Sequence, residues 1–192
     1  MDFDAALDEA EQIPDDSMSL KVCINRAIAR KRAELLDALD AARKAEAKQA
    51  AEDPRLGATG PVDTTASEAA LAAFEAHEPE VQNALIELKF TRLDPNEWTL
   101  LTQLYPMRPE VQLDRHYGYN FDEVSKQAAR RSGVRLDGDS EVSLTEAQWT
   151  RMFGKKVLSA PDLARVVDVI WTLNEYKPAQ DIAALVKGSG VA

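Results

Sequence analysis

The chain has 192 residues, of which 33 are acidic and 23 are basic, so its formal net charge at pH 7 is -10. This length allows one sizeable core, and the negative charge argues against broad nucleic-acid binding, because phosphate contacts need concentrated positive potential. The single cysteine, Cys23, excludes an intramolecular disulfide and a cysteine-based zinc site. His77 and His116 are far apart in sequence, and the turn Asp137-Gly138-Asp139 lacks the other ligands of a calcium loop, so we expect no metal or cofactor.

The N-terminal region is acidic, and we expect no secretory signal in it. No run approaches the roughly 18 apolar residues of a membrane span, and the first residues lack the basic start of a secretory signal. We therefore expect an intracellular protein without membrane contact. Residues 1–19 hold seven acidic side chains and neither Lys nor Arg, which predicts a flexible acidic arm. That arm is a solvated tail or, alternatively, a contact for a basic partner.

Residues 20–52 are predicted to form a short strand and a long helix. Apolar and polar residues alternate over Leu20–Ile24, as in a half-buried strand, and Asn25 is placed to cap the next helix. The helical pattern continues to about Ala51. Only its first half is amphipathic, so we expect the half beyond Ala41 to be a projecting arm or a self-association surface. Residues 53–66 contain glycine and proline and are predicted to form a linker.

Residues 67–176 are predicted to form a helical core domain. A helix capped by Thr65 or Ser67 should be interrupted at Pro79. The pattern from Leu85 onward fits either a resumed helix or a strand, Leu85–Phe90, that pairs with Leu20–Ile24. Residues 177–192 are expected to be a tail with a short helix. The fold class is therefore mainly α, with a long N-terminal helix and, in one interpretation, a two-stranded sheet.

The stretch from Phe90 to Val134 contains clear helix boundaries. Asp94 suits an N-cap and Pro95 suits the first helical position, since its missing N–H has no partner there. Asn120 is placed to cap a second helix, and Gly133 is a natural stop for it. The sequence predicts two helices joined by a long aromatic connector.

The first of these helices should turn one apolar face inward. Trp98 and Leu101, followed by Leu104 or Tyr105, lie on one side of a helix that ends before Pro106.

A Ser143-x-x-Glu146 capping box predicts the start of a further helix. Ser159, with Pro161 in the first turn, predicts the start of the last long helix. We expect Lys177-Pro178 to break that helix.

Several short motifs follow one another in a defined order along most of the chain. They are Phe90-Thr-Arg-Leu93 with Trp98, Leu104-Tyr-Pro106, Tyr119-Asn-Phe121, Gln148-Trp149 and Trp171-Thr-Leu-Asn174. Their order, over most of the chain after Leu20, resembles the tail assembly chaperones of long-tailed (siphovirus-type) bacteriophages of actinobacteria.

The resemblance implies a role in virion assembly. Such proteins bind the tape measure protein, a long apolar helical chain that sets tail length, and keep it soluble while the tail tube polymerises. They act in the host cytoplasm and are absent from the finished virion. Many have a longer form, made by ribosomal frameshifting, that engages tail tube protein, and this chain resembles the shorter product or the shared part. The sequence leaves a homo-oligomer open.

A protein that shields an apolar helix needs an apolar groove, and an acidic surface keeps the loaded complex from associating further. The expected groove-lining residues are Trp98, Leu101, Tyr105, Tyr117 and Tyr119, and the expected rim charges are Arg130 and Arg131. For Trp98 and Leu101, an ordinary place in the core is the favoured interpretation.

Two other classes of protein remain as alternatives. A structural head-tail connector or minor tail protein is the closer one. A small nucleic-acid-binding regulator is suggested by Lys126, Arg130, Arg131 and Arg135, but the acidic total disfavours it. We expect no enzyme, because no grouping of acidic residues or histidine provides a positioned nucleophile and base.

Overall fold

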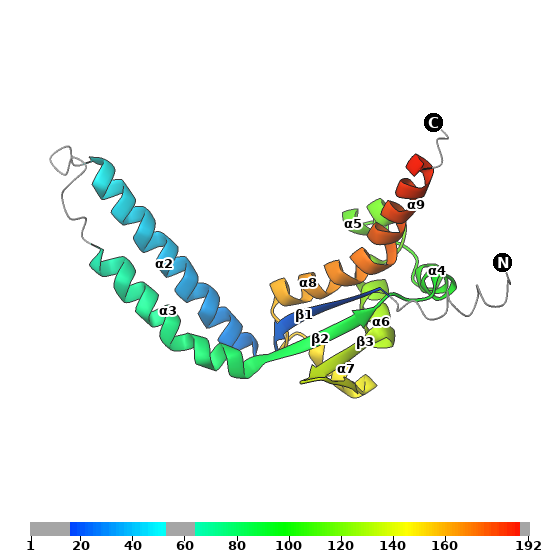
Figure 1. Cartoon of the computed structure of the whole chain (residues 1–192), viewed down its shortest axis with the longest axis horizontal. Coiled ribbons are helices and arrows are strands. Elements are labelled where there is room, and N and C mark those ends of the chain that lie inside the picture. Colours follow the sequence, from blue (N-terminus) through cyan, green and yellow to red (C-terminus); the bar gives the residue numbers. More distant parts are fainter. Residues whose placement is uncertain (1–15, 53–63, 189–192) are drawn as a thin grey trace. The chain divides into compact units, whose positions relative to one another are not determined.

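The computed structural model describes residues 16–52 and 64–188 (Figure 1). Its described residues divide into two compact units, one made of 16–22, 87–153 and 160–188, the other of 23–52, 64–86 and 154–159. The fold is mostly helical with a small four-stranded antiparallel sheet, which confirms the predicted fold class and the strand interpretation of the segment after Ala84.

The sheet contains two strands that the sequence did not predict. In order, its strands are β1 (Ser17–Cys23), β2 (Leu85–Thr91), β3 (Gly133–Asp137) and β4 (Ser140–Ser143). Backbone bonds at the two ends of the first pair, from Ile24 N–H to Ala84 O at 3.0 Å and from Arg92 N–H to Asp16 O at 2.8 Å, fit antiparallel pairing. β3 and β4 form a hairpin around Gly138, whose φ of 59° suits glycine.

Apolar side chains on one face of the sheet form the core of the first unit. Val22, Leu88 and Phe90 are completely buried and alternate with more exposed residues along their strands. Helices α6 (Phe121–Ser132) and α8 (Ala160–Trp171) pack against each other. Their fully or almost fully buried apolar side chains are Val124, Ala128, Ala129, Val166 and Ile170.

Gly133 joins α6 to β3 where there is no room for a side chain. A Cβ there would lie 2.4 Å from Ala129 O, 2.7 Å from Phe90 Cε1 and 2.8 Å from Trp149 Cζ2. Trp149, on α7 (Glu146–Met152), is buried with its ring centroid 6.3 Å from that of Phe90. The residue ends α6 as predicted, but its φ of -92° shows that space, and not a left-handed backbone, requires glycine.

The second unit contains a hairpin of two long helices, α2 (Arg26–Glu52) and α3 (Thr65–Ala84). As predicted, the Asn25 side chain caps α2, accepting from Ala27 N–H at 3.1 Å. The second half of α2, for which we expected a projecting arm or a self-association surface, packs along α3. There the buried Glu46 carboxylate accepts from Ser67 N–H at 2.7 Å.

Four predicted boundaries are wrong, two of them at prolines. α3 continues through Pro79, because burial of His77 and Val81 on either side offsets the roughly 3 kcal/mol cost of a proline inside a helix. At Lys177-Pro178, where we expected a break, a π-helical turn, η2 (Thr172–Tyr176), joins α8 directly to α9 (Lys177–Gly188), whose first turn contains Pro178.

The other two wrong boundaries are the starts of α3 and α7. The N-cap position of α3 is Thr64, whose side chain makes no capping hydrogen bond, and not Thr65 or Ser67. The start of α7 also differs from the prediction. Its capping box is Thr145 with Gln148 and not Ser143 with Glu146, since Ser143 belongs to β4.

Among the described helices, none is both long enough and apolar enough to cross a membrane.

Replacing Gly133 by alanine should lower the free energy of unfolding by about 3 kcal/mol, because a Cβ would overlap a backbone oxygen and two packed rings. Gly118→Ala is the comparison variant. Gly118 has a φ of 82° but nothing within 4 Å of its Cβ position, so we expect a loss of roughly 1 kcal/mol from backbone strain. Urea denaturation of both variants checks this, and equal losses would contradict the packing argument.

Candidate functional site

Helix α4 (Pro95–Leu104) begins as the sequence predicts. The Asp94 side chain accepts from Asn96 N–H at 2.8 Å and from Glu97 N–H at 3.4 Å, and Pro95 occupies the first turn. The helix ends where Tyr105 leaves the helical region, with φ -118° and ψ 79°. Local chemistry at both ends therefore fixes this ten-residue helix.

The inward face of α4 settles an alternative that the sequence left open. Leu101 is 1% exposed, and Trp98 and Tyr105 are half-buried. Leu104 is 63% exposed and points away from the core. Tyr105 and not Leu104 therefore completes the inward stripe.

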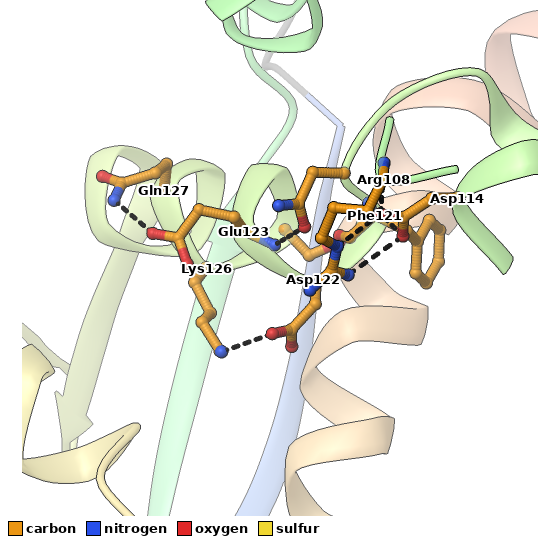
Figure 2. A network of polar contacts seen from close by, with 9 residues as sticks. Arg108, Asp114, Phe121, Asp122, Glu123, Lys126 and Gln127 are labelled. Atoms are coloured by element: carbon orange, nitrogen blue, oxygen red, sulfur yellow. Dashed lines mark hydrogen bonds and ion pairs between the residues drawn. The ribbon is translucent and has the colours of Figure 1, made fainter. Parts of the chain in front are cut away.

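The connector after α4 contains a short helix, α5 (Gln112–Tyr117), that ends at the left-handed Gly118. Its centre is the carboxylate of Asp114, which is completely buried. Figure 2 shows the side chains of Arg108, Asp114 and Phe121 together. Asp114 Oδ2 accepts from Arg108 N–H at 3.1 Å and from Arg108 Nε at 2.6 Å, and Oδ1 accepts from Arg108 Nη2 at 3.1 Å and from Phe121 N–H at 3.2 Å.

These contacts determine how the Asp114 carboxyl titrates. The Arg108 side-chain hydrogen bonds hold the pKa of Asp114 below its ordinary value, and bonds from the backbone N–H groups of Arg108 and Phe121 act in the same direction. Burial opposes this effect but does not cancel it. The carboxylate is therefore ionised at neutral pH and holds a fork-shaped pair with the guanidinium.

Six aromatic rings from α4, the connector, α6, α8 and η2 form a connected group that we call the aromatic cluster. Its members are Trp98, Tyr117, Tyr119, Phe121, Trp171 and Tyr176. The ring centroid of Tyr117 is 4.4 Å from that of Phe121 and 6.0 Å from that of Trp171. Trp98 meets Tyr119 edge to face at 6.0 Å. The rings are within the range in which aromatic pairs stabilise each other.

Tyr119 connects the cluster to the π-helical turn. Its hydroxyl donates to Glu175 Oε1 at 2.8 Å, and the ring is only 5% exposed. Burial, followed by the Glu175 carboxylate, raises the pKa of Tyr119 far above its ordinary value, so the phenol stays protonated. Tyr119 therefore acts as a buried hydrogen-bond donor.

The five expected groove residues lie in one unit, but they differ in exposure. Leu101 and Tyr119 are inside the fold, and Trp98, Tyr105 and Tyr117 are half-buried. The rings therefore contact one another extensively. Partner contact by the half-buried residues stays a prediction, whereas Leu101 and Tyr119 are placed to support the surface from within.

The two expected rim charges, Arg130 and Arg131, face different helices. Arg131 Nη1 pairs with Glu97 on α4 at 3.1 Å. Arg130 Nε lies 3.3 Å from the carboxylate of Glu146 on α7, and its guanidinium is 5.7 Å from the Phe153 ring centroid. Both arginines hold α6 to neighbouring helices, so their predicted role with a partner would require these contacts to be shared.

The most exposed apolar side chains of this region are not among the residues expected to bind a partner. Leu100 and Leu104 are each 63% exposed, Met107 is 45% exposed and Leu113 is 49% exposed. We call these four residues the apolar surface set. Leu100 and Leu104 are four positions apart, so they share one side of α4, away from Trp98 and Leu101. That spacing was the available signal in the sequence.

The stability of the protein in acid should depend on Asp114. A carboxyl whose pKa is lower in the folded state stabilises the protein fully above its unfolded pKa, and this contribution is lost as pH falls through the folded pKa. Wild-type protein should therefore lose free energy of unfolding more steeply below about pH 4 than Asp114→Asn does. Urea denaturation from pH 7 to pH 2.5 measures this, and parallel pH profiles for the two proteins would refute it.

Among the residues that the structure describes, no group of three or more His, Cys, Asp or Glu side chains is arranged to hold a metal ion. A scan of protein-family models and searches of curated proteins and solved structures each found no match to this chain.

Proposed function

We propose that this chain is a phage tail assembly chaperone that binds apolar helical segments of the tape measure protein and keeps that protein soluble in the host cytoplasm. The resemblance in the order of short motifs suggests the family. The observation that carries the proposal is the exposure of Leu100 and Leu104 on one side of α4, with Met107 and Leu113 exposed in the connector that follows. Large apolar groups gathered on one helix face are typical of surfaces that bind other proteins.

The geometry of α4 suits a helical client. An amphipathic helix commonly binds through side chains spaced three or four positions apart, and Leu100 and Leu104 offer complementary spacing. Burying a leucine completely contributes about 1.5 to 3 kcal/mol. Two leucines could therefore supply a useful part of the free energy of binding, while leaving the complex reversible, as a transient escort requires.

Contacts behind α4 hold this surface in place before a client arrives. Trp98 packs edge to face on Tyr119, and Glu97 pairs with Arg131 of α6. Leu101 is buried on the inner side of the same helix. A surface that is already ordered loses less conformational entropy on binding, which favours affinity.

The charge of the chain supports the same role. A net charge of -10 makes copies of the protein repel one another, so a complex that carries an apolar client is less prone to aggregate. It also favours client segments with basic residues beside their apolar face.

The charges that suggested nucleic-acid binding are engaged within the protein. Arg130 and Arg131 pair with Glu146 and Glu97, as described above. Lys126 Nζ pairs with Asp122 at 2.6 Å, and Arg135 Nη2 pairs with Asp137 at 2.9 Å. Each basic side chain has a carboxylate beside it, so the group offers little free positive potential for phosphate, and a regulator is disfavoured.

The direct test is co-expression with the product of the very long open reading frame that the proposal places downstream of this gene. Wild-type protein should keep that product soluble and copurify with it. Replacing Leu100 and Leu104 together by serine should weaken binding at least tenfold, because two apolar contacts are lost. Leu36→Ser is the matched control, since Leu36 is a 42% exposed leucine on α2.

Circular dichroism should be unchanged in these variants, because the replaced side chains are exposed. Undiminished binding by the double variant would remove the observation on which the proposal depends.

Mass spectrometry of purified virions separates the chaperone from a structural head-tail connector or minor tail protein. We expect peptides of this chain in infected-cell lysate and none in the virion, because an escort leaves once the tail tube has polymerised. Recovery at a fixed copy number per virion would favour the structural alternative. A longer form that engages tail tube protein would be visible in the same lysate as peptides from an overlapping reading frame.

A further inference from the structure

We propose that Asp114 is a positioning residue for partner binding: its carboxylate fixes the connector so that Met107 and Leu113 are presented to a client beside α4. This inference rests on the proposed function and deepens it. It states that one buried side chain determines the conformation of the exposed surface.

The first argument is the reach of the contacts. Asp114 bonds to Arg108, six positions earlier, and to the backbone of Phe121, seven positions later. One carboxylate therefore closes a loop on each side of itself. Met107 and Leu113 are the chain neighbours of Arg108 and Asp114, so the direction of their side chains depends directly on these bonds.

The second argument is that the backbone bonds which cross the connector join only its two ends. Asn120 N–H donates to Tyr105 O at 2.9 Å, and Pro106 and Tyr119 form an isolated β-bridge. These bonds bring the two ends together. Between them, Val111 N–H donates to Arg108 O at 3.0 Å and the Tyr117 ring stacks on Phe121, but it is the Asp114 side chain that bonds both to the beginning of the connector and to the first turn of α6. Gly118 N–H also donates to the backbone oxygen of Asp114 at 2.7 Å, and this bond closes the last turn of α5.

The third argument is energetic. Burying a carboxylate costs several kcal/mol in desolvation, and its partners recover this cost only if the geometry is good, so a buried ion pair adds little net stability. Its directional bonds instead select one conformation among several. A forked arginine and two backbone N–H groups meet both oxygens of Asp114, whereas an apolar residue there would leave the two N–H groups without this acceptor.

The test compares Asp114→Asn with Asp122→Asn, using amide hydrogen exchange on the full chain and binding to the tape measure protein. The side-chain amide that Asp114→Asn introduces has only one oxygen, so it cannot accept the arginine fork at both positions. We expect amides of residues 107–120 to exchange at least tenfold faster and the client to bind at least tenfold more weakly. Amides of β2 and α2 should keep their wild-type exchange.

Asp122→Asn is matched in charge and lies beside the same network, but Asp122 pairs with Lys126 outside the connector (Figure 2). It should change neither the exchange of residues 107–120 nor the binding.

Arg108→Lys is the second variant, in case Asp114→Asn fails to fold. It keeps the positive charge but loses the forked guanidinium. It should therefore raise the exchange rates of the same amides and weaken client binding.

Unchanged exchange over residues 107–120 in a folded variant would overturn the positioning role. Faster exchange together with undiminished client binding would also overturn the positioning role. In that case the chaperone proposal would still stand, provided that the Leu100 and Leu104 double variant had lost binding. Absence of binding by the wild-type chain would instead overturn the proposed function, and the positioning role with it.

Discussion

The carboxylate of Asp114 joins three parts of the chain: the beginning of the connector, the short helix α5 and the first turn of α6. It is a charged group without solvent exposure in a region where many neighbouring side chains are exposed. Such a group is stable only if its partners are held in place, so the carboxylate and its donors order one another. The position of Tyr117, at the end of α5, and hence the centre of the aromatic cluster, follows from this arrangement.

The π-helical turn η2 also provides hydrogen bonds to the region around the aromatic cluster. Within it, the buried Asn174 accepts from Leu93 N–H at 2.9 Å and donates to Ile170 O at 2.8 Å, while Glu175 accepts from Tyr119. A widened helical turn frees backbone groups that then need other partners, and such turns are frequent at functional sites. Here the turn connects the end of β2, the connector and α8, so that the apolar surface set lies on a region whose interior is extensively hydrogen-bonded.

The two units differ in the interactions that stabilise each of them internally. The first has a sheet and helices with a continuous apolar core. The hairpin of α2 and α3 buries fewer large apolar side chains, among them Leu39 and Val81, and adds polar contacts such as the ion pair of Arg32 with Glu78 at 3.2 Å. Polar contacts between paired helices fix their register at some cost in stability. If the chain is a chaperone, the first unit carries the surface proposed for the client.

The helix starts at Asp94 and Asn120 could be predicted from the sequence, because a cap is a contact between residues two or three positions apart and needs no tertiary structure. The mainly helical class could be predicted in the same way. The passage of α3 through Pro79 depends on packing between distant parts of the chain, since the cost of a proline is local whereas the burial that offsets it comes from another helix. β3 and β4 are too short to show a clear periodicity in the sequence, and they form because they pair with each other. The exposure of Leu104 likewise depends on tertiary packing, because it is set by which side of α4 meets α6.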